Sequence, residues 1–152
     1  MYSREEARRL REDFWTAFGQ YMRAVPSADG ERVSWLNYKT GIKHLYFRMD
    51  VDNNVARIGI DIRHPDSGIR SLIFAQFLEL QTVFGHTVGN DWIWEEHGME
   101  QEREQACIYT ELQKVTVFRK EDWPTLISFF KPRIIALDEF WSLAKHHFEI
   151  FR

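Results

Sequence analysis

Residues 35–64 read WLNYKTGIKHLYFRMDVDNNVARIGIDIRH, and this stretch decides the fold. Apolar and polar side chains alternate over residues 43–51 and again over residues 55–63. Such alternation is typical of strands that have one face in a core and the other face outside it. The intervening residues 52–54, Asp-Asn-Asn, are turn formers that tolerate a positive φ. The stretch therefore predicts a β-hairpin.

The alternation also assigns the side chains of the hairpin to two faces. The apolar face carries Leu45, Phe47, Met49, Ile58, Ile60 and Ile62. The opposite face carries Tyr46, Arg48, Asp50, Arg57, Asp61 and Arg63. We expect the apolar face to pack into the core. Gly59 lies on the polar face, and a glycine within a strand often marks close approach by a backbone or a ligand.

The rest of the chain predicts helices at both ends and one in the middle. Ser3 and Glu6 fit a capping box before a helix over residues 4–24. A second helix is expected over residues 66–84, with Asp66 or Ser67 as its cap. A C-terminal helical region begins near Asp122. Because a proline inside a helix removes one hydrogen bond, we expect Pro132 to kink or break this region near residues 129–131 and a second helix to follow.

Further strands complete the expected fold. They are predicted at residues 33–38, 91–96, 106–112 and 115–118, with a charged turn at residues 98–104. The resulting order is α-βββ-α-ββ(β)-α. This order is typical of an α+β domain with a mainly antiparallel sheet of five to six strands and helices packed on one face.

Composition limits the classes of function. The chain has 152 residues, which suits one globular domain over residues 1–152. A net charge of −3 argues against a protein whose whole surface binds nucleic acid. A single cysteine, Cys107, excludes an intramolecular disulfide and favours a reducing compartment. The start of the chain lacks a signal-peptide pattern, and no apolar run approaches membrane-spanning length. We therefore expect a cytoplasmic protein without a membrane partner.

A polar, mostly basic cluster precedes the hairpin and continues onto its polar face. Its members are Asn37, Lys39, Thr40, Lys43, His44, Tyr46, Arg48, Arg57 and Asp61. Arginine binds phosphate or carboxylate through paired hydrogen bonds. We therefore predict a non-catalytic binding module for an anionic ligand, and the alternative is a solvated face with cross-strand ion pairs. Aromatic side chains beside basic ones can stack nucleic-acid bases, so a nucleic-acid-associated accessory protein is a second candidate.

Catalytic motifs are incomplete in the sequence. A restriction-type nuclease site needs an acidic-x-Lys triplet near a Pro-Asp pair to hold a metal ion. Pro65 and Asp66 supply the pair, but residues 61–63 (Asp-Ile-Arg) and 111–113 (Glu-Leu-Gln) lack the lysine. The six histidines form no His-Glu-x-x-His motif. We expect no catalytic set, no metal site and no cofactor.

Two further functions stay open. One is an enzyme of unassigned type that uses His44 with Asp61 or Asp50, which requires a histidine with a shifted pKa in a pocket. The other is a homodimer. The C-terminal helical region is rich in Trp and Phe, and more apolar surface than a small sheet covers would leave an exposed aromatic patch.

Three stretches resemble an uncharacterised bacterial family, a domain of unknown function. They are residues 14–18 (FWTAF), 35–50 (WLNYKTGIKHLYFRMD) and 123–141 (WPTLISFFKPRIIALDEFW). The resemblance implies a stand-alone version of a domain that in larger proteins lies C-terminal to a restriction-endonuclease-like domain. This domain context implies a role near nucleic acid or in defence. The resemblance implies no catalytic residue, since the family carries no established activity.

Overall fold

The computed structural model of the protein describes residues 2–100 and 102–152. The elements in chain order are α1 (Arg4–Met22), β1 (Leu45–Val51), β2 (Val55–Ile62), α2 (Ser67–Glu79), α3 (Gln81–Thr87), β3 (Ile93–Glu100), β4 (Arg103–Gln113), the 3-10 helix η1 (Lys120–Asp122), α4 (Trp123–Ala144) and the 3-10 helix η2 (Lys145–Phe151). The strands form one antiparallel sheet in the order β1-β2-β4-β3. The chain is therefore α+β, as predicted.

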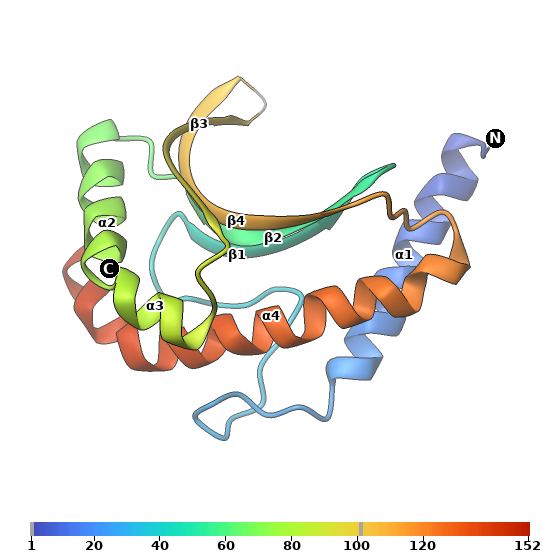
Figure 1. Ribbon diagram of the computed structural model, residues 1–152, viewed down its shortest axis with the longest axis horizontal. Helices are drawn as coiled ribbons and strands as arrows, with labels where there is room; N and C mark the ends of the chain where they lie inside the picture. Colours follow the sequence, from blue (N-terminus) through green and yellow to red (C-terminus); the bar gives the residue numbers. More distant parts are fainter. Residues whose placement is uncertain (1, 101) are drawn as a thin grey trace.

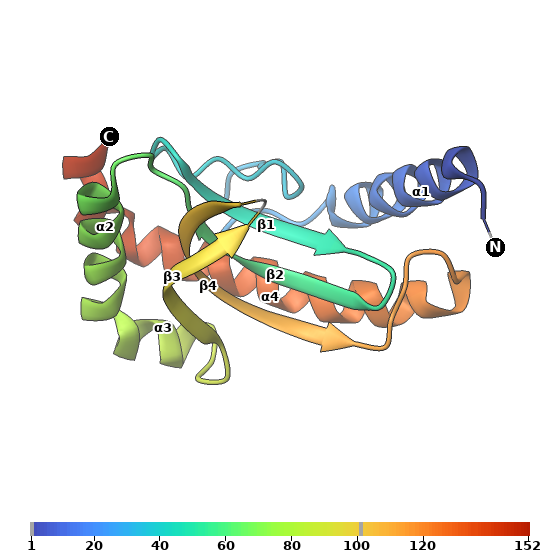
Figure 2. The same cartoon turned by 90° about the horizontal axis from the view of Figure 1, so that it is seen from above.

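The helices lie on one side of the sheet and at its ends. Helix α4 runs along one face, and α2 with α3 stands at one end (Figure 1). Helix α1 lies toward the other end, beside the start of α4 (Figure 2). Among the described residues, no helix covers the opposite face of the sheet, and the β3–β4 hairpin curls over part of it (Figures 1 and 2).

The predicted β-hairpin forms as β1 and β2, which pair antiparallel in register from Leu45 opposite Ile62 to Val51 opposite Ala56. Its turn is closed by a side chain. The carboxylate of Asp52 accepts hydrogen bonds from the backbone N–H groups of residues 54 and 55, both at 2.9 Å. None of residues 52–54 has a positive φ. The turn therefore depends on this carboxylate rather than on the left-handed backbone that its composition suggested.

Two predicted strands are wrong, and the sheet has four strands rather than five to six. Residues 33–38 form a loop with a turn, and so do residues 115–118. Their apolar side chains pack without pairing into the sheet. The Tyr38 ring stacks on Phe47 with centroids 5.0 Å apart, and Val115 and Val117 are 6% and 0% exposed. Alternation here therefore reflects packing against the core beside the sheet.

The second hairpin is longer than predicted. The segment expected as a charged turn, residues 98–104, mostly continues the strands, because β3 extends to Glu100 and β4 begins at Arg103. Gln101, which belongs to that expected turn, lies outside the described residues. The pairing register shifts between Glu95 and Gly98, which is a bulge. A bulge bends a hairpin and increases its twist, and this hairpin curves away from α4 (Figure 1).

Helix caps form as predicted. The Ser3 hydroxyl accepts from the Glu6 N–H at 3.1 Å and donates to the Glu6 carboxylate at 3.2 Å. Helix α1 ends at Met22, two residues before the expected end. The Asp66 carboxylate accepts from the Ile69 N–H at 3.0 Å and begins α2. The expected long middle helix is divided at Leu80 into α2 and α3.

Helix α4 runs unbroken through Pro132, so the predicted division into two helices is wrong. The proline removes the N–H that would bond to the carbonyl of Ser128. Both residues are exposed, a setting in which water compensates for a lost backbone hydrogen bond. The flanking side chains Phe130 and Ile134 are fully buried and hold the helix on the core. Packing on two sides thus outweighs the loss of one hydrogen bond.

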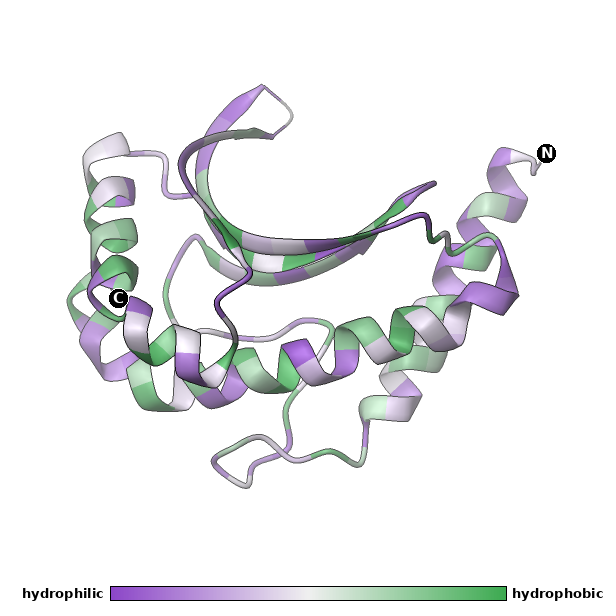
Figure 3. Cartoon of the chain, viewed as in Figure 1, coloured by the Kyte–Doolittle hydropathy of each residue, from purple (hydrophilic) through white to green (hydrophobic). Residues whose placement is uncertain are grey.

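The core lies between the apolar face of the sheet and α4. The side chains of Ile58, Ile60 and Ile62 are 0% exposed, and burial of each stabilises the fold by about 1.5–3 kcal/mol. Hydrophobic residues follow α4 and the strands above it (Figure 3). Four large rings of α4 are also buried: Phe129, Phe130, Phe140 and Trp141. Apart from the half-buried Trp123, the aromatic rings of α4 therefore lie inside the chain's own core.

Within the described part of the chain, no helix combines the length and the apolar character needed to cross a bilayer.

Candidate functional site

The structure divides the predicted site residues between two regions. One region, the α4 pocket, lies between the loop of residues 27–42 and the C-terminal part of α4 with η2, and it contains Asn37, Lys39 and Thr40. The other, the open sheet face, is the side of the sheet turned away from α4, and it contains Tyr46, Arg48, Arg57 and Asp61. Lys43 and His44 lie in the bend that precedes β1. The single cluster expected from the sequence is therefore two separate candidate sites.

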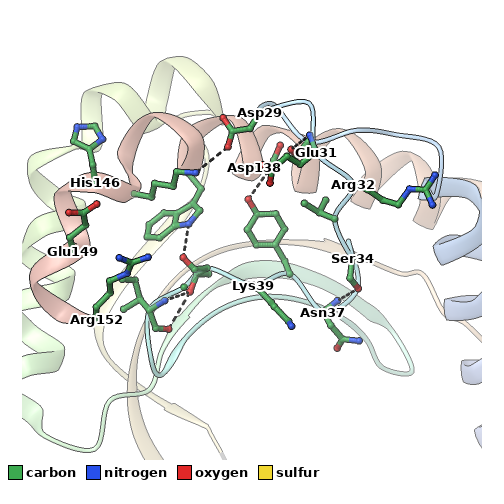
Figure 4. A pocket seen from close by; sticks show the side chains of 18 residues that line it. Asp29, Glu31, Arg32, Ser34, Asn37, Lys39, Asp138, His146, Glu149 and Arg152 are labelled. Carbon is green, nitrogen blue, oxygen red and sulfur yellow. Dashed lines mark hydrogen bonds and ion pairs between the residues drawn. The ribbon is translucent and has the colours of Figure 1, made fainter.

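The α4 pocket is a cavity of about 630 Å³ (Figure 4). This volume falls within the range of roughly 300–1,000 Å³ that is usual for small-molecule sites. The loop of residues 27–42 forms one wall, and α4 with η2 forms the other. Apolar and aromatic side chains contribute to the lining, namely Val33, Tyr38, Ile42 and Trp141.

Asp138 fixes the loop wall of the α4 pocket. Its carboxylate is 3% exposed and accepts two short hydrogen bonds, from the Ala28 N–H and from the Tyr38 hydroxyl, both at 2.6 Å. Burial, together with the Asp138 hydrogen bond, raises the pKa of Tyr38, so the phenol stays protonated and donating. One turn along α4, the Trp141 indole N–H donates to the Thr40 carbonyl at 3.0 Å. Hydrogen bonds to Asp138 and Trp141 of α4 therefore fix the conformation of the loop of residues 27–42.

The rim of the α4 pocket carries charges of both signs (Figure 4). Asp29 is neutralised by Lys145 at 3.1 Å and accepts from Ser142 at 2.6 Å. The hydrogen bonds from Ser142 and Lys145 lower the pKa of this exposed carboxyl. Other charged side chains on the rim form no ion pair with any described residue: Arg32, Lys39, Arg152, Glu31 and Glu149. Three of these are cations and two are carboxylates. With Asp29, Lys145 and the buried Asp138, the lining holds four carboxylates and four Lys or Arg side chains, so its cationic donors are local rather than a net positive charge.

The open sheet face is organised around Gly59 on β2. A Cβ atom there would lie 2.7 Å from the Tyr109 Cβ and 2.8 Å from the Ile108 carbonyl oxygen. The absence of a side chain therefore lets Tyr109 of β4 approach β2 closely. The Arg57 guanidinium lies over the Tyr109 ring, 3.8 Å from its centroid. Tyr109 donates to Glu95 at 2.6 Å, and this hydrogen bond with burial raises the pKa of Tyr109 to about 12.

A buried carboxylate lies next to this aromatic pair. Asp61 is 6% exposed, and Arg63 contacts it at 3.2 Å while also donating to Glu100 at 2.6 Å. Arg48 is more distant, 3.6 Å from Asp61 and 3.9 Å from Glu100. Burial raises the pKa of Asp61 and outweighs the opposing effect of the arginines, chiefly Arg63. Desolvation of the charged form thus dominates at this position.

The predicted catalytic pairing of His44 is not formed. The His44 ring lies edge-on to His64 with centroids 5.1 Å apart, and among the described residues no hydrogen bond or ion pair joins it to Asp61 or Asp50. The Asp50 carboxylate instead accepts from the Val51 N–H at 3.0 Å. Within the described residues, no group of three His, Cys, Asp or Glu side chains is arranged to hold a metal ion.

Sequence reasoning missed the α4 side of the pocket. Asp138 and Trp141 are about 100 positions from the loop residues that they contact, Tyr38 and Thr40. One signal was present, because Asp138 interrupts the apolar pattern of a buried helix next to Leu137. A carboxylate at a core position requires hydrogen-bond donors, but the pattern alone does not identify them.

A family model for a domain of unknown function (DUF4268) matches residues 10–145. The matched range includes both candidate sites except for His146, Glu149 and Arg152 at the η2 end of the α4 pocket. No curated protein and no solved structure matches the chain. The match covers most of the chain and includes the three stretches on which the resemblance rested, so the chain belongs to the DUF4268 family of domains of unknown function.

Proposed function

We propose that this protein is a non-catalytic binding module whose α4 pocket takes a small organic anion. The observation that carries the proposal is a cavity of about 630 Å³ with a hydrogen-bonded wall and unpaired cations on its rim. Because Asp138 and Trp141 already fix the loop wall, this wall does not have to become ordered on ligand binding. Pre-organisation of this kind increases affinity because less conformational freedom is lost on binding.

The chemistry of the lining points to the class of ligand. Lys39, Arg32 and Arg152 offer charged donors that suit a carboxylate or a phosphate group. Tyr38 and Trp141 on the wall suit a flat apolar portion of the same molecule. A mononucleotide or an aromatic carboxylic acid combines both features. Glu31 and Glu149 on the same rim oppose a long polyanion, since binding along a phosphate backbone relies on a local excess of Lys and Arg.

The proposal is tested by calorimetric titration of the protein with mononucleotides, with aromatic carboxylates, and with short single-stranded DNA and RNA oligonucleotides. We expect binding of at least one small anion, and a loss of about tenfold in affinity in Lys39→Ala, because a hydrogen bond to a charged group is removed. Arg9→Ala is the control: it removes an exposed cation on α1 that lines neither this pocket nor the open sheet face, and it leaves the affinity unchanged.

Three results contradict the proposal: no binding of any small anion, equal affinity of Lys39→Ala and the unchanged protein, or an equal loss of affinity in Lys39→Ala and Arg9→Ala. Binding of the oligonucleotide that weakens steeply with salt favours the nucleic-acid-associated role instead. Circular dichroism of each variant verifies that the fold is retained.

Other expectations from the sequence stay predictions. They are the enzymatic use of His44, the bacterial origin, the cytoplasmic location, the homodimer, and the company of a restriction-endonuclease-like domain in larger proteins. Sedimentation at micromolar concentration measures the oligomeric state directly.

A further inference from the structure

A second cavity, of about 700 Å³, lies on the open sheet face and is lined almost entirely by charged and polar side chains: Arg48, Arg63, Glu100, Arg103, Glu104 and Gln105. They come from β1, β3, β4 and the residue that follows β2, so the curvature of the sheet brings them together. We call it the arginine cavity. It shares no lining residue with the α4 pocket.

We propose that the arginine cavity is a binding site for a compact phosphate dianion or pyrophosphate, and that the Glu100 carboxylate occupies the position of this anion in the unliganded protein. Glu100 lies between two guanidinium groups, 2.6 Å from Arg63 and 3.9 Å from Arg48. This is the position in which an external oxyanion would receive hydrogen bonds from both.

Arg63 is already oriented for this role. Its Nε donates to Gln105, which is 5% exposed, at 2.9 Å. Its Nη2 contacts the buried Asp61 at 3.2 Å. These two buried partners hold the guanidinium plane in place without Glu100. An arginine fixed in this way loses little freedom when it binds an anion.

Arg48 and Arg103 have unused donors. Arg48 approaches Asp61 and Glu100 only to 3.6 and 3.9 Å, and it donates no hydrogen bond to any described residue. Arg103 forms no ion pair with a described residue. Glu100 contacts two of the three guanidinium groups, and only its contact with Arg63 is a hydrogen bond, so donors of Arg48 and Arg103 remain for further oxygens. A phosphate, with more oxygens and a larger charge, matches them better.

The other carboxylate of the lining is neutralised from outside the cavity. Glu104 pairs with Arg70 at 3.3 Å and with His97 at 3.0 Å, and these hydrogen bonds lower its pKa. Glu100 is different. Its pair with Arg63 is partly exposed, 40% and 34% for the two side chains, and exposed ion pairs contribute little to stability. An anion in solution therefore displaces Glu100 with little loss of stability.

Titration with sodium pyrophosphate and with inorganic phosphate, at constant ionic strength in chloride, tests the inference. We expect Glu100→Gln to raise the affinity for pyrophosphate by about tenfold, because a competing and repelling charge is removed. Arg48→Gln and Arg103→Gln are each expected to lower the affinity by a similar factor. Glu79→Gln on α2 is the charge-matched control and leaves the affinity unchanged.

The variants distinguish a failure of this inference from a failure of the proposal for the α4 pocket. Lys39→Ala removes a rim cation of the α4 pocket and is expected to leave pyrophosphate binding unchanged. A larger loss in Lys39→Ala than in Arg48→Gln would move the anion to the α4 pocket and overturn this inference. Equal or weaker binding in Glu100→Gln would show that Glu100 belongs to an ordinary ion-pair network. Absence of pyrophosphate binding in both the unchanged protein and Glu100→Gln would also overturn it.

Discussion

Ile60 and Asp61 are neighbours on β2, and both are buried, but they are buried by different parts of the molecule. Ile60 points to the core, where α4 covers the sheet. Asp61 points to the open sheet face, where it contacts the guanidinium groups of Arg63, the residue after β2, and of Arg48 on β1. One face is thus closed by apolar packing and the other by a network of charges. The first kind of burial stabilises the fold, whereas the second raises the pKa of Asp61 and leaves donors for a ligand.

The largest expected effect is on the core face. Ile60→Ala removes a fully buried side chain and is expected to lower the free energy of unfolding by about 2–5 kcal/mol, because a cavity forms where the surroundings cannot collapse. Urea unfolding measures this loss. Tyr46→Ala is the control on the open face, where the ring is 43% exposed, and its expected loss is below about 1 kcal/mol. Similar losses in the two variants would contradict the distinction between the faces.

Asp138→Asn tests the wall of the α4 pocket. The carboxylate accepts from Ala28 and Tyr38 with different oxygens, and an amide offers only one acceptor oxygen. One part-buried donor then loses its hydrogen bond to a charged acceptor, and we expect a loss of about 1–3 kcal/mol in unfolding free energy. In a double-mutant cycle with Tyr38→Phe, the losses should be less than additive. Full additivity would mean that the two side chains do not act together.

Gly59→Ala tests the close approach of strands on the open sheet face. The added Cβ would meet the Tyr109 Cβ at 2.7 Å, and neither atom moves without the backbone. We expect a loss of about 1–3 kcal/mol in unfolding free energy. Ala75→Gly, at an exposed position of α2, is a comparison in which only helix propensity changes, by about 1 kcal/mol. A Gly59→Ala variant as stable as the unchanged protein would contradict the steric role of this glycine.

The smallest expected effect is a pH dependence that comes from Asp61. Burial raises the pKa of the folded state above its ordinary value of 3.8, so in the interval above 3.8 the folded protein binds more protons than the unfolded chain. The contribution of Asp61 to the free energy of unfolding therefore falls as pH rises through this interval. Asp61→Asn lacks this contribution. The difference in unfolding free energy, variant minus unchanged protein, should become more positive as pH rises from 3.8.

Unfolding curves measured at several pH values provide this difference. A constant difference, or one that becomes more negative, would show that the arginines rather than burial control Asp61. NMR titration of the carboxyl carbon checks the direction of the pKa shift independently.

Local patterns predicted a good part of the fold. The β1–β2 hairpin, its two faces and the caps at Ser3 and Asp66 follow from residues close in sequence. The candidate site was predicted as a set of residues but not as an arrangement. Lys39 and Arg48 are close in sequence, and the sheet places them on opposite sides. Glu100 was not predicted at all, since it was expected in a turn and lies instead at the end of β3.

The sequence by itself determined which side chains of the hairpin are apolar and where the first two helices begin, because alternation and capping depend on neighbours within a few positions. Only the tertiary structure decided that residues 33–38 pack beside the sheet, that α4 continues through Pro132, and that Asp138 holds the loop. It also brought Glu100 to Arg63. These outcomes depend on contacts between distant segments, where burial and hydrogen bonding outweigh local preference.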